Sequence, residues 1–183
     1  MTTPELIRAQ RAYFETGATR TAAFRLAALK KLQAAVQARE TELAAAMMAD
    51  FRKAPLEVYM TETGLVLDEI RFHIRHLTRW MRDTRVPTPL AQFPAKSFRS
   101  PEPYGVCLIL APWNYPIQLC LEPLIGAISG GNCAVVKPSA YAPATSRALA
   151  RLLGETFDPA YIAVVEGGRE ENKALLDERF DLI

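Results

Sequence analysis

Three short segments carry the side chains that are best suited to chemistry. Asn114 lies in "APWNYP", Lys137 ends the apolar run "CAVVK", and Glu166 precedes two glycines in "VVEGG". The Asn114 amide could donate a hydrogen bond to a developing oxyanion, or it could simply cap the following helix. The Lys137 ammonium could bind the hydroxyls or phosphates of a nucleotide, and a solvated lysine at a strand end is the alternative. The roles of both therefore depend on where the fold places them.

Histidines and cysteines give weaker signals. His73 and His76 are three residues apart and could share a helix face, but no carboxylate or cysteine cluster is evident nearby, so no metal site is predicted. Cys107, Cys120 and Cys133 each lie within an apolar run. This context predicts buried thiols, and neither a disulfide framework nor a metal site is indicated.

Helical patterns dominate residues 1–83, which carry most of the charge. Apolar residues recur at helical spacing over 19–51, which predicts one long or two abutting amphipathic helices. A second stripe begins at Pro55 and is interrupted at 62–64, where the helix either kinks or brings its backbone close to another segment. Five prolines in residues 84–103 then exclude a helix and indicate an extended segment.

Short apolar runs alternate with helix-length segments after Tyr104. This alternation predicts βαβ units with right-handed crossovers and a parallel sheet. The fold class is therefore α/β, with a helical lead-in and an incomplete, doubly wound, Rossmann-like sheet. A fourth apolar run begins at Asp181 and has only three residues, so we expect the sequence to be the front portion of a longer protein.

Ligands of open parallel sheets bind beyond the carboxyl ends of the strands. Residues 112–115, 137–140 and 166–168 follow the three expected strands, so we expect them at one edge. No G-x-G-x-x-G follows the first strand, and a dinucleotide would therefore be held differently. Gly130 and Gly131 belong to the opposite edge, where they are interpreted as a helix C-cap.

Composition excludes several classes of function. The net charge of +2 gives no reason to expect nucleic acid as a partner, since such surfaces usually show a clear basic excess. The amino terminus lacks the apolar core of a secretory signal, which predicts a cytoplasmic protein. Residues 108–140 are the most apolar stretch, but Pro, Asn, Gln and Glu interrupt it, so no membrane segment is expected.

The motifs "APWNYP" and "AVVKPS", together with "PLEVYMTE", resemble the amino-terminal portion of the aldehyde dehydrogenase superfamily, in its short branch of dimeric and fatty aldehyde dehydrogenases. This resemblance implies oxidation of an aldehyde to a carboxylic acid through a cysteine thioester, with NAD or NADP as cofactor, in a homodimer. It also implies that residues 1–83 pack on the cofactor domain, that 84–103 start the oligomerisation sheet, and that 104–183 form the first half of the cofactor domain.

The resemblance assigns roles to individual residues. Asn114 would stabilise the oxyanion with the backbone N–H of the catalytic cysteine, and Lys137 would contact the adenosine ribose. Tyr115 and Leu119 would line the aldehyde tunnel. The cofactor-binding residues implied are Ala111, Pro112, Trp113, Lys137, Ser139 and Ala140.

Two departures from the family pattern matter. Ala140 occupies a position that usually holds a glutamate, which binds the ribose hydroxyls; its loss predicts that NADP is tolerated or preferred. The glycine-bearing nicotinamide segment, the glutamate base and the nucleophilic cysteine of the family are absent, so this chain alone is expected to be inactive. Alternatives are a semialdehyde or acyl-phosphate reductase and a non-catalytic, truncated nucleotide-binding or assembly module.

Overall fold

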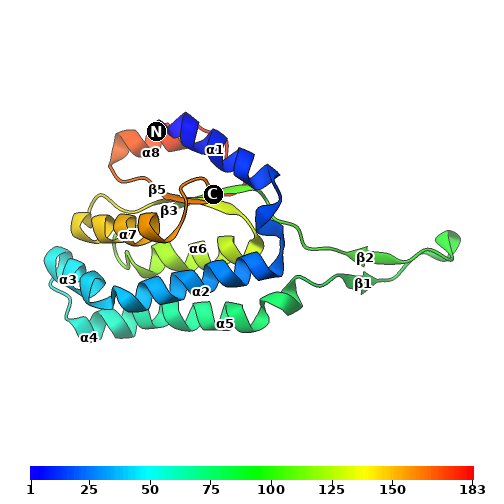
Figure 1. The fold of residues 1–183 in the computed structure, drawn as a ribbon, viewed down its shortest axis with the longest axis horizontal. Helices are drawn as coiled ribbons and strands as arrows, with labels where there is room; N and C mark the ends of the chain where they lie inside the picture. Colours follow the sequence, from blue (N-terminus) through cyan, green and yellow to red (C-terminus); the bar gives the residue numbers. More distant parts are fainter.

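A parallel sheet separates two sets of helices in the computed structural model, which describes residues 1–183 (Figure 1). Its strands are β3 (Val106–Leu110), β4 (Cys133–Lys137) and β5 (Ile162–Val164), in the order β3-β4-β5. Apolar β-branched residues favour these strands because the sheet is covered on both faces. The predicted α/β class is confirmed.

The chain begins a fourth strand beside β3. Leu182 forms a parallel bridge with Cys107, and its carbonyl accepts a hydrogen bond of 2.9 Å from the N–H of Leu108. The chain thus runs from β3 to β4 to β5 and returns to the other side of β3. The strand order therefore reverses at β3, as in doubly wound sheets.

One face of the sheet is covered by α1 (Thr3–Glu15) and α8 (Arg169–Leu176). A small core forms here, because adjacent strands present one residue each at the same register. Its members are Leu6, Ile7, Leu108, Val135, Ala163 and Leu175. The amino-terminal helix is therefore part of the sheet's covering layer.

The other face carries α6 (Gln118–Gly130) and α7 (Pro143–Thr156), and a further layer packs outside them (Figure 1). Gly131 ends α6 with φ 82°, which confirms the predicted C-cap. The outer layer comprises the 3₁₀ turn Ala18–Arg20, α2 (Ala22–Ala38), α3 (Glu40–Phe51), α4 (Pro55–Val58) and α5 (Gly64–Trp80). A single larger core joins these helices to the sheet.

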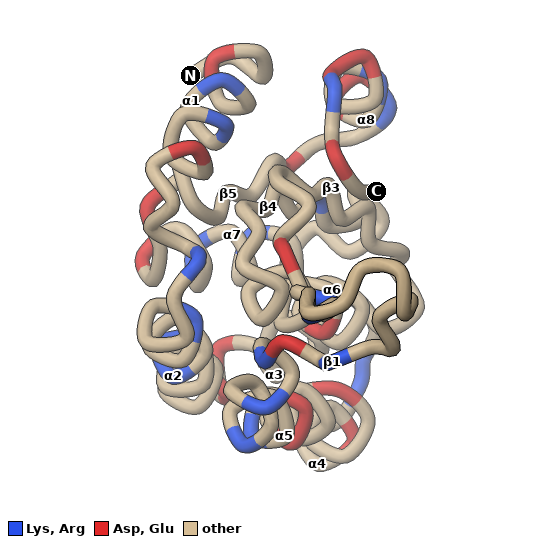
Figure 2. The backbone as a smooth tube through the Cα atoms, turned by 90° about the vertical axis from the view of Figure 1, so that its right-hand side faces the viewer, with Lys and Arg blue, Asp and Glu red and all other residues tan.

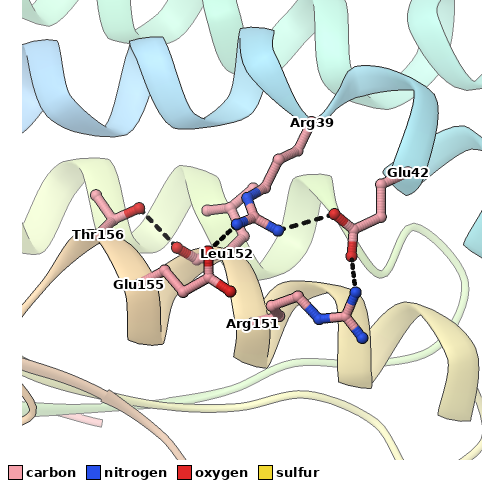
Figure 3. Close-up of polar contacts among 6 residues, drawn as sticks. All are labelled: Arg39, Glu42, Arg151, Leu152, Glu155 and Thr156. Carbon is pink, nitrogen blue, oxygen red and sulfur yellow. Dashed lines mark hydrogen bonds and ion pairs between the residues drawn. The ribbon is translucent and has the colours of Figure 1, made fainter.

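Arg39 separates α2 from α3, which decides between one long helix and two abutting helices. Its guanidinium pairs with Glu42 at 2.8 Å and with Glu155 of α7, while Arg151 contacts the other oxygen of Glu42 at 3.0 Å (Figure 3). These ion pairs connect the helix junction to α7. The residues are partly exposed, so each pair adds at most about 1 kcal/mol.

The interruption predicted at 62–64 is a π-helical segment, Tyr59–Thr63, which links α4 to α5. A Cβ on Gly64 would lie 2.5 Å from the carbonyl oxygen of Tyr59. Glycine is therefore required for the two turns to approach. The widened turn leaves Glu62 and Thr63 fully buried.

Residues 84–103 form an extended arm that projects from the helical body (Figure 1). The strands β1 (Thr84–Val86) and β2 (Ser97–Arg99) pair antiparallel, and a 3₁₀ turn, Leu90–Gln92, lies between them. The large side chains of Leu90, Phe93 and Phe98 are exposed. The extended conformation is confirmed, whereas the assignment of this arm to an oligomerisation sheet stays a prediction, as do the domain boundaries.

Charged residues of both signs lie on the outer helices, basic on α2 and acidic on α3, and the central strands carry few of them (Figure 2). No helix combines the length and the apolarity that a bilayer crossing requires.

Candidate functional site

A hollow of about 610 Å³ opens at the carboxyl ends of β3 and β4. Ala111 and Pro112 follow β3, Ser139 and Ala140 follow β4, and all four line the hollow with Lys137. The remaining lining residues are Leu110, Pro138, Tyr141, Gly168, Arg169 and Asn172. Five of the six residues that the family resemblance assigns to cofactor binding thus line this hollow, and Trp113 does not.

Lys137 is a buried cation in this hollow, with 3% of its surface exposed. Its Nζ donates to the carbonyl oxygens of Pro138 at 2.8 Å and of Gly167 at 2.6 Å. Burial lowers the pKa of Lys137, which the charges of Glu171 and Glu166 partly oppose. The alternative of a solvated lysine is therefore wrong, and one of its three donors stays free for a ligand.

The loop that joins β5 to α8 closes one side of the hollow. Gly167 has φ 126°, and the N–H of Gly168 donates to the Glu171 carboxylate at 2.6 Å. Hydrogen bonds from the backbone N–H groups of Glu171 and Gly168 lower the pKa of Glu171, so the loop is held by an ionised carboxylate. Glu166 accepts a hydrogen bond from the Ser146 hydroxyl at 3.3 Å and does not line the hollow.

Asn114 lies on an exposed turn two residues after Pro112, which lines the hollow, and its side chain makes no hydrogen bond within the chain. Helix α6 begins at Gln118 with Ile117 as its N-cap, so Asn114 does not cap it. Trp113 and Tyr115 on either side are 54% and 42% exposed. The amide of Asn114 is therefore available to a ligand.

The sequence did not identify the group that caps α6. Glu62 Oε2 accepts hydrogen bonds from the N–H groups of Ile117 at 2.8 Å and Gln118 at 3.4 Å, and Lys53 Nζ lies 2.8 Å from Glu62 Oε1. Lys53 Nζ also lies 4.9 Å from the centre of the Tyr115 ring. In the sequence, only the interruption of the helical apolar pattern at 62–64 pointed to Glu62. That interruption did not show that Glu62 would contact Ile117 and Gln118.

A second hollow, of about 570 Å³, lies beside β3 and α6 and is mostly apolar. Leu119 lines it with Cys107, Leu108 and Leu182, but Tyr115 does not. The structure therefore does not bring the two residues nominated for the aldehyde tunnel into one cavity.

Cys107, Cys120 and Cys133 are free and buried, as predicted. Burial raises their pKa values to about 11, 12 and 12, respectively. A thiolate is the nucleophilic form of cysteine, so these side chains are unsuited to attack a substrate.

The two histidines have different environments. His73 Nε2 lies 2.9 Å from Glu69 Oε1, and His73 Nδ1 lies 2.6 Å from the Ser129 hydroxyl. A single carboxylate, that of Glu69, therefore lies beside His73. His76 instead contacts the carbonyl of Phe72 at 2.8 Å. No three His, Cys, Asp or Glu residues are grouped as metal ligands.

A hollow at the carboxyl edge of a parallel sheet, near a reversal of strand order, is the place at which open α/β domains bind their ligands. The profile of the Aldehyde dehydrogenase family matches residues 2–183. The chain therefore belongs to the aldehyde dehydrogenase family.

Two curated relatives show which branch the chain resembles. It is 44% identical over 173 residues to 4,4'-diaponeurosporen-aldehyde dehydrogenase of Staphylococcus aureus, an alignment that covers 94% of this chain and 38% of the relative. It is 40% identical over 179 residues to human aldehyde dehydrogenase family 3 member B1, in an alignment that covers 98% of this chain and 38% of the relative. The chain thus spans little more than a third of these relatives.

Solved structures of aldehyde dehydrogenases have the same fold as this chain. The substrate-bound state of Staphylococcus aureus AldH superposes with a TM-score of 0.97 at 42% identity, covering all of this chain and 40% of that one. Indole-3-acetaldehyde dehydrogenase in its apo form gives a TM-score of 0.80 at 26% identity, with 94% and 41% covered.

Proposed function

We propose that this chain is the amino-terminal portion of an NAD(P)-dependent aldehyde dehydrogenase that oxidises an aldehyde to a carboxylic acid. The observation that supports it best is the hollow at the carboxyl edge, in which a buried lysine and the residues that follow two strands converge. In the complete enzyme, residues outside this chain would supply the nucleophilic cysteine and the general base. The relatives named above support this extension, because the chain spans only part of them.

The residues present fit a nicotinamide dinucleotide. The free donor of Lys137 and the Ser139 hydroxyl suit the hydroxyls of a ribose, and the backbone of Ala111 and Pro112 offers a surface for the rest of the cofactor. When bound, the cofactor supplies a hydride acceptor. Lys137 would act from a fixed position, because two carbonyls already hold its ammonium.

Asn114 would act on the substrate. Attack of a thiolate on an aldehyde moves negative charge onto the carbonyl oxygen, and an oriented amide N–H stabilises that charge. The Asn114 amide has no competing partner in the chain and projects from an exposed turn that follows Pro112 of the hollow. Loss of hydride to the bound cofactor would convert this adduct into a thioester, and hydrolysis of the thioester would release the carboxylic acid.

We propose that the complete enzyme accepts NADP as well as NAD, because Ala140 stands where the family usually has a glutamate. A 2'-phosphate near Ala140 meets no carboxylate at that position, and Arg169 lines the same hollow.

We also propose a homodimer, for which the exposed apolar side chains of the β1–β2 arm are available. A cytoplasmic location agrees with three unpaired thiols.

The proposal is tested in the complete enzyme by following aldehyde-dependent formation of NADH or NADPH. Replacing Asn114 with Ala should lower kcat about a hundredfold, because one oxyanion donor is lost while the fold stays intact. Circular dichroism checks the fold. An unchanged kcat would remove Asn114 from the mechanism, and a wild-type enzyme that oxidises no aldehyde would favour the non-catalytic module instead.

A further inference from the structure

A buried ion pair lies at the turn that carries Asn114. Glu62 is fully buried, and the side chain of Lys53 is 11% exposed. Lys53 lies between α3 and α4, and Glu62 lies in the π-helical segment that follows α4. Their charged atoms are 2.8 Å apart.

The pair contacts the part of the turn that follows Asn114. On the carboxyl side, Glu62 accepts hydrogen bonds from the N–H groups of Ile117 and Gln118. On the amino side of these amides, Lys53 Nζ faces the ring of Tyr115, the residue that follows Asn114. Since the Asn114 side chain makes no hydrogen bond within the chain, these contacts hold the backbone from which its amide projects.

Burial of such a pair is expensive. An ionised carboxylate taken out of water is tolerated when it is paired and hydrogen-bonded, and apolar side chains of similar volume often stabilise a fold as well or better. An apolar side chain could fill this space, but it could not accept hydrogen bonds from the amides of Ile117 and Gln118 or hold a cation against Tyr115. The contacts therefore favour a role in placement over a role in stability alone.

We propose that Glu62, through its ion pair with Lys53, is a positioning residue that fixes the Asn114 turn for oxyanion binding. This inference rests on the proposed function. Glu62 touches neither substrate nor cofactor: it holds Ile117 and, through Lys53, Tyr115. Small displacements of a group that stabilises a transition state are costly, so loss of this anchor lowers kcat more than it alters cofactor binding.

The test is a double-mutant cycle between Glu62→Gln and Asn114→Ala in the complete enzyme. Glu62→Gln should lower kcat about tenfold and leave the KM for the cofactor within about twofold. In the Asn114→Ala background the same substitution should lower kcat by less than about twofold, because the group that it positions is gone. Glu57→Gln, an exposed carboxylate on α4, is the matched control and should leave kcat unchanged.

Glu62→Gln also leaves Lys53 without its counter-charge, which can prevent folding. The cycle is therefore repeated with the double substitution Glu62→Gln and Lys53→Met, which removes both charges at similar volume. The same non-additive loss of kcat supports the proposal.

Equal losses of kcat in both Asn114 backgrounds would show a general structural role and overturn the proposal, as would an unchanged kcat in the Glu62 variants. If Asn114→Ala alone leaves kcat unchanged, the role given to Asn114 under the proposed function fails, and the present inference falls with it. The first two results leave that function standing, so the two failures are distinguishable.

Discussion

Ala140 is the residue at which cofactor choice is most directly tested. Replacing it with Glu places a carboxylate in the hollow beside the expected ribose. In the complete enzyme, the ratio of kcat/KM for NAD to that for NADP should rise about tenfold or more, because the carboxylate accepts from ribose hydroxyls and repels a 2'-phosphate.

The control is the same substitution, Ala34→Glu, at an exposed position of α2 that does not line the hollow. It should change the ratio much less. A strong preference of the wild-type enzyme for NAD would contradict the role given to Ala140.

The three thiols define a pH dependence of stability. Burial raises the pKa values of Cys107, Cys120 and Cys133 from 9.0 to about 11, 12 and 12, so the folded chain binds their protons more tightly than the unfolded chain does. Their contribution to stability is complete below pH 9 and is lost as the pH rises through the range from 9 to 12. The midpoint of urea unfolding should therefore fall progressively above pH 9.

Replacement of each of these cysteines with Ala provides the comparison for that measurement. The variants should lose part of the alkaline dependence, although truncation itself lowers their stability. A folded chain that reacts rapidly with a thiol reagent at pH 8 would show that the thiols are accessible and contradict the prediction.

At the scale of elements, the π-helical segment depends on one glycine. Gly64→Ala should destabilise the protein by about 1–3 kcal/mol, because its Cβ would lie 2.5 Å from the backbone oxygen of Tyr59. A Cβ on Gly154, in α7, would meet no other atom within 4 Å. Gly154→Ala should instead stabilise the protein by about 0.5–1 kcal/mol, since alanine favours a helix.

Denaturant unfolding of the two variants measures both effects. Similar changes in the two free energies of unfolding would show that general helix propensity, and not the close approach at Tyr59, governs Gly64.

Elements that depend on local pattern were predictable. The apolar runs at β3 and β4 and the glycine that ends α6 are read from neighbouring residues, and the ligand edge follows from the parallel arrangement. The cap of α6 was not, because Glu62 lies 55 residues before Ile117 and reaches it only through tertiary packing. The burial of Lys137 likewise depends on a carbonyl 30 residues away, at Gly167.

At the scale of the whole molecule, the chain leaves apolar surface open beside β3. The hollow lined by Leu119 has nine apolar members among its fourteen residues, and Tyr104 and Ile183 at its rim are 70% and 68% exposed. Surfaces of this kind promote association. We therefore expect the 183-residue chain, produced alone, to self-associate.

Light scattering after size-exclusion chromatography measures the mass. A monodisperse 20.3 kDa species at micromolar concentration would contradict this expectation. The complete enzyme, analysed in parallel, is the control for association through the β1–β2 arm.

The carboxylate at the start of α6 also provides a spectroscopic reporter. Amides in the first turn of a helix usually lack an intramolecular acceptor and exchange quickly with solvent. The Ile117 amide is buried and donates to a carboxylate, so its proton should exchange slowly and resonate far downfield in an NMR spectrum. That single resonance would report the state of the Asn114 turn in the resting protein, before any aldehyde is added.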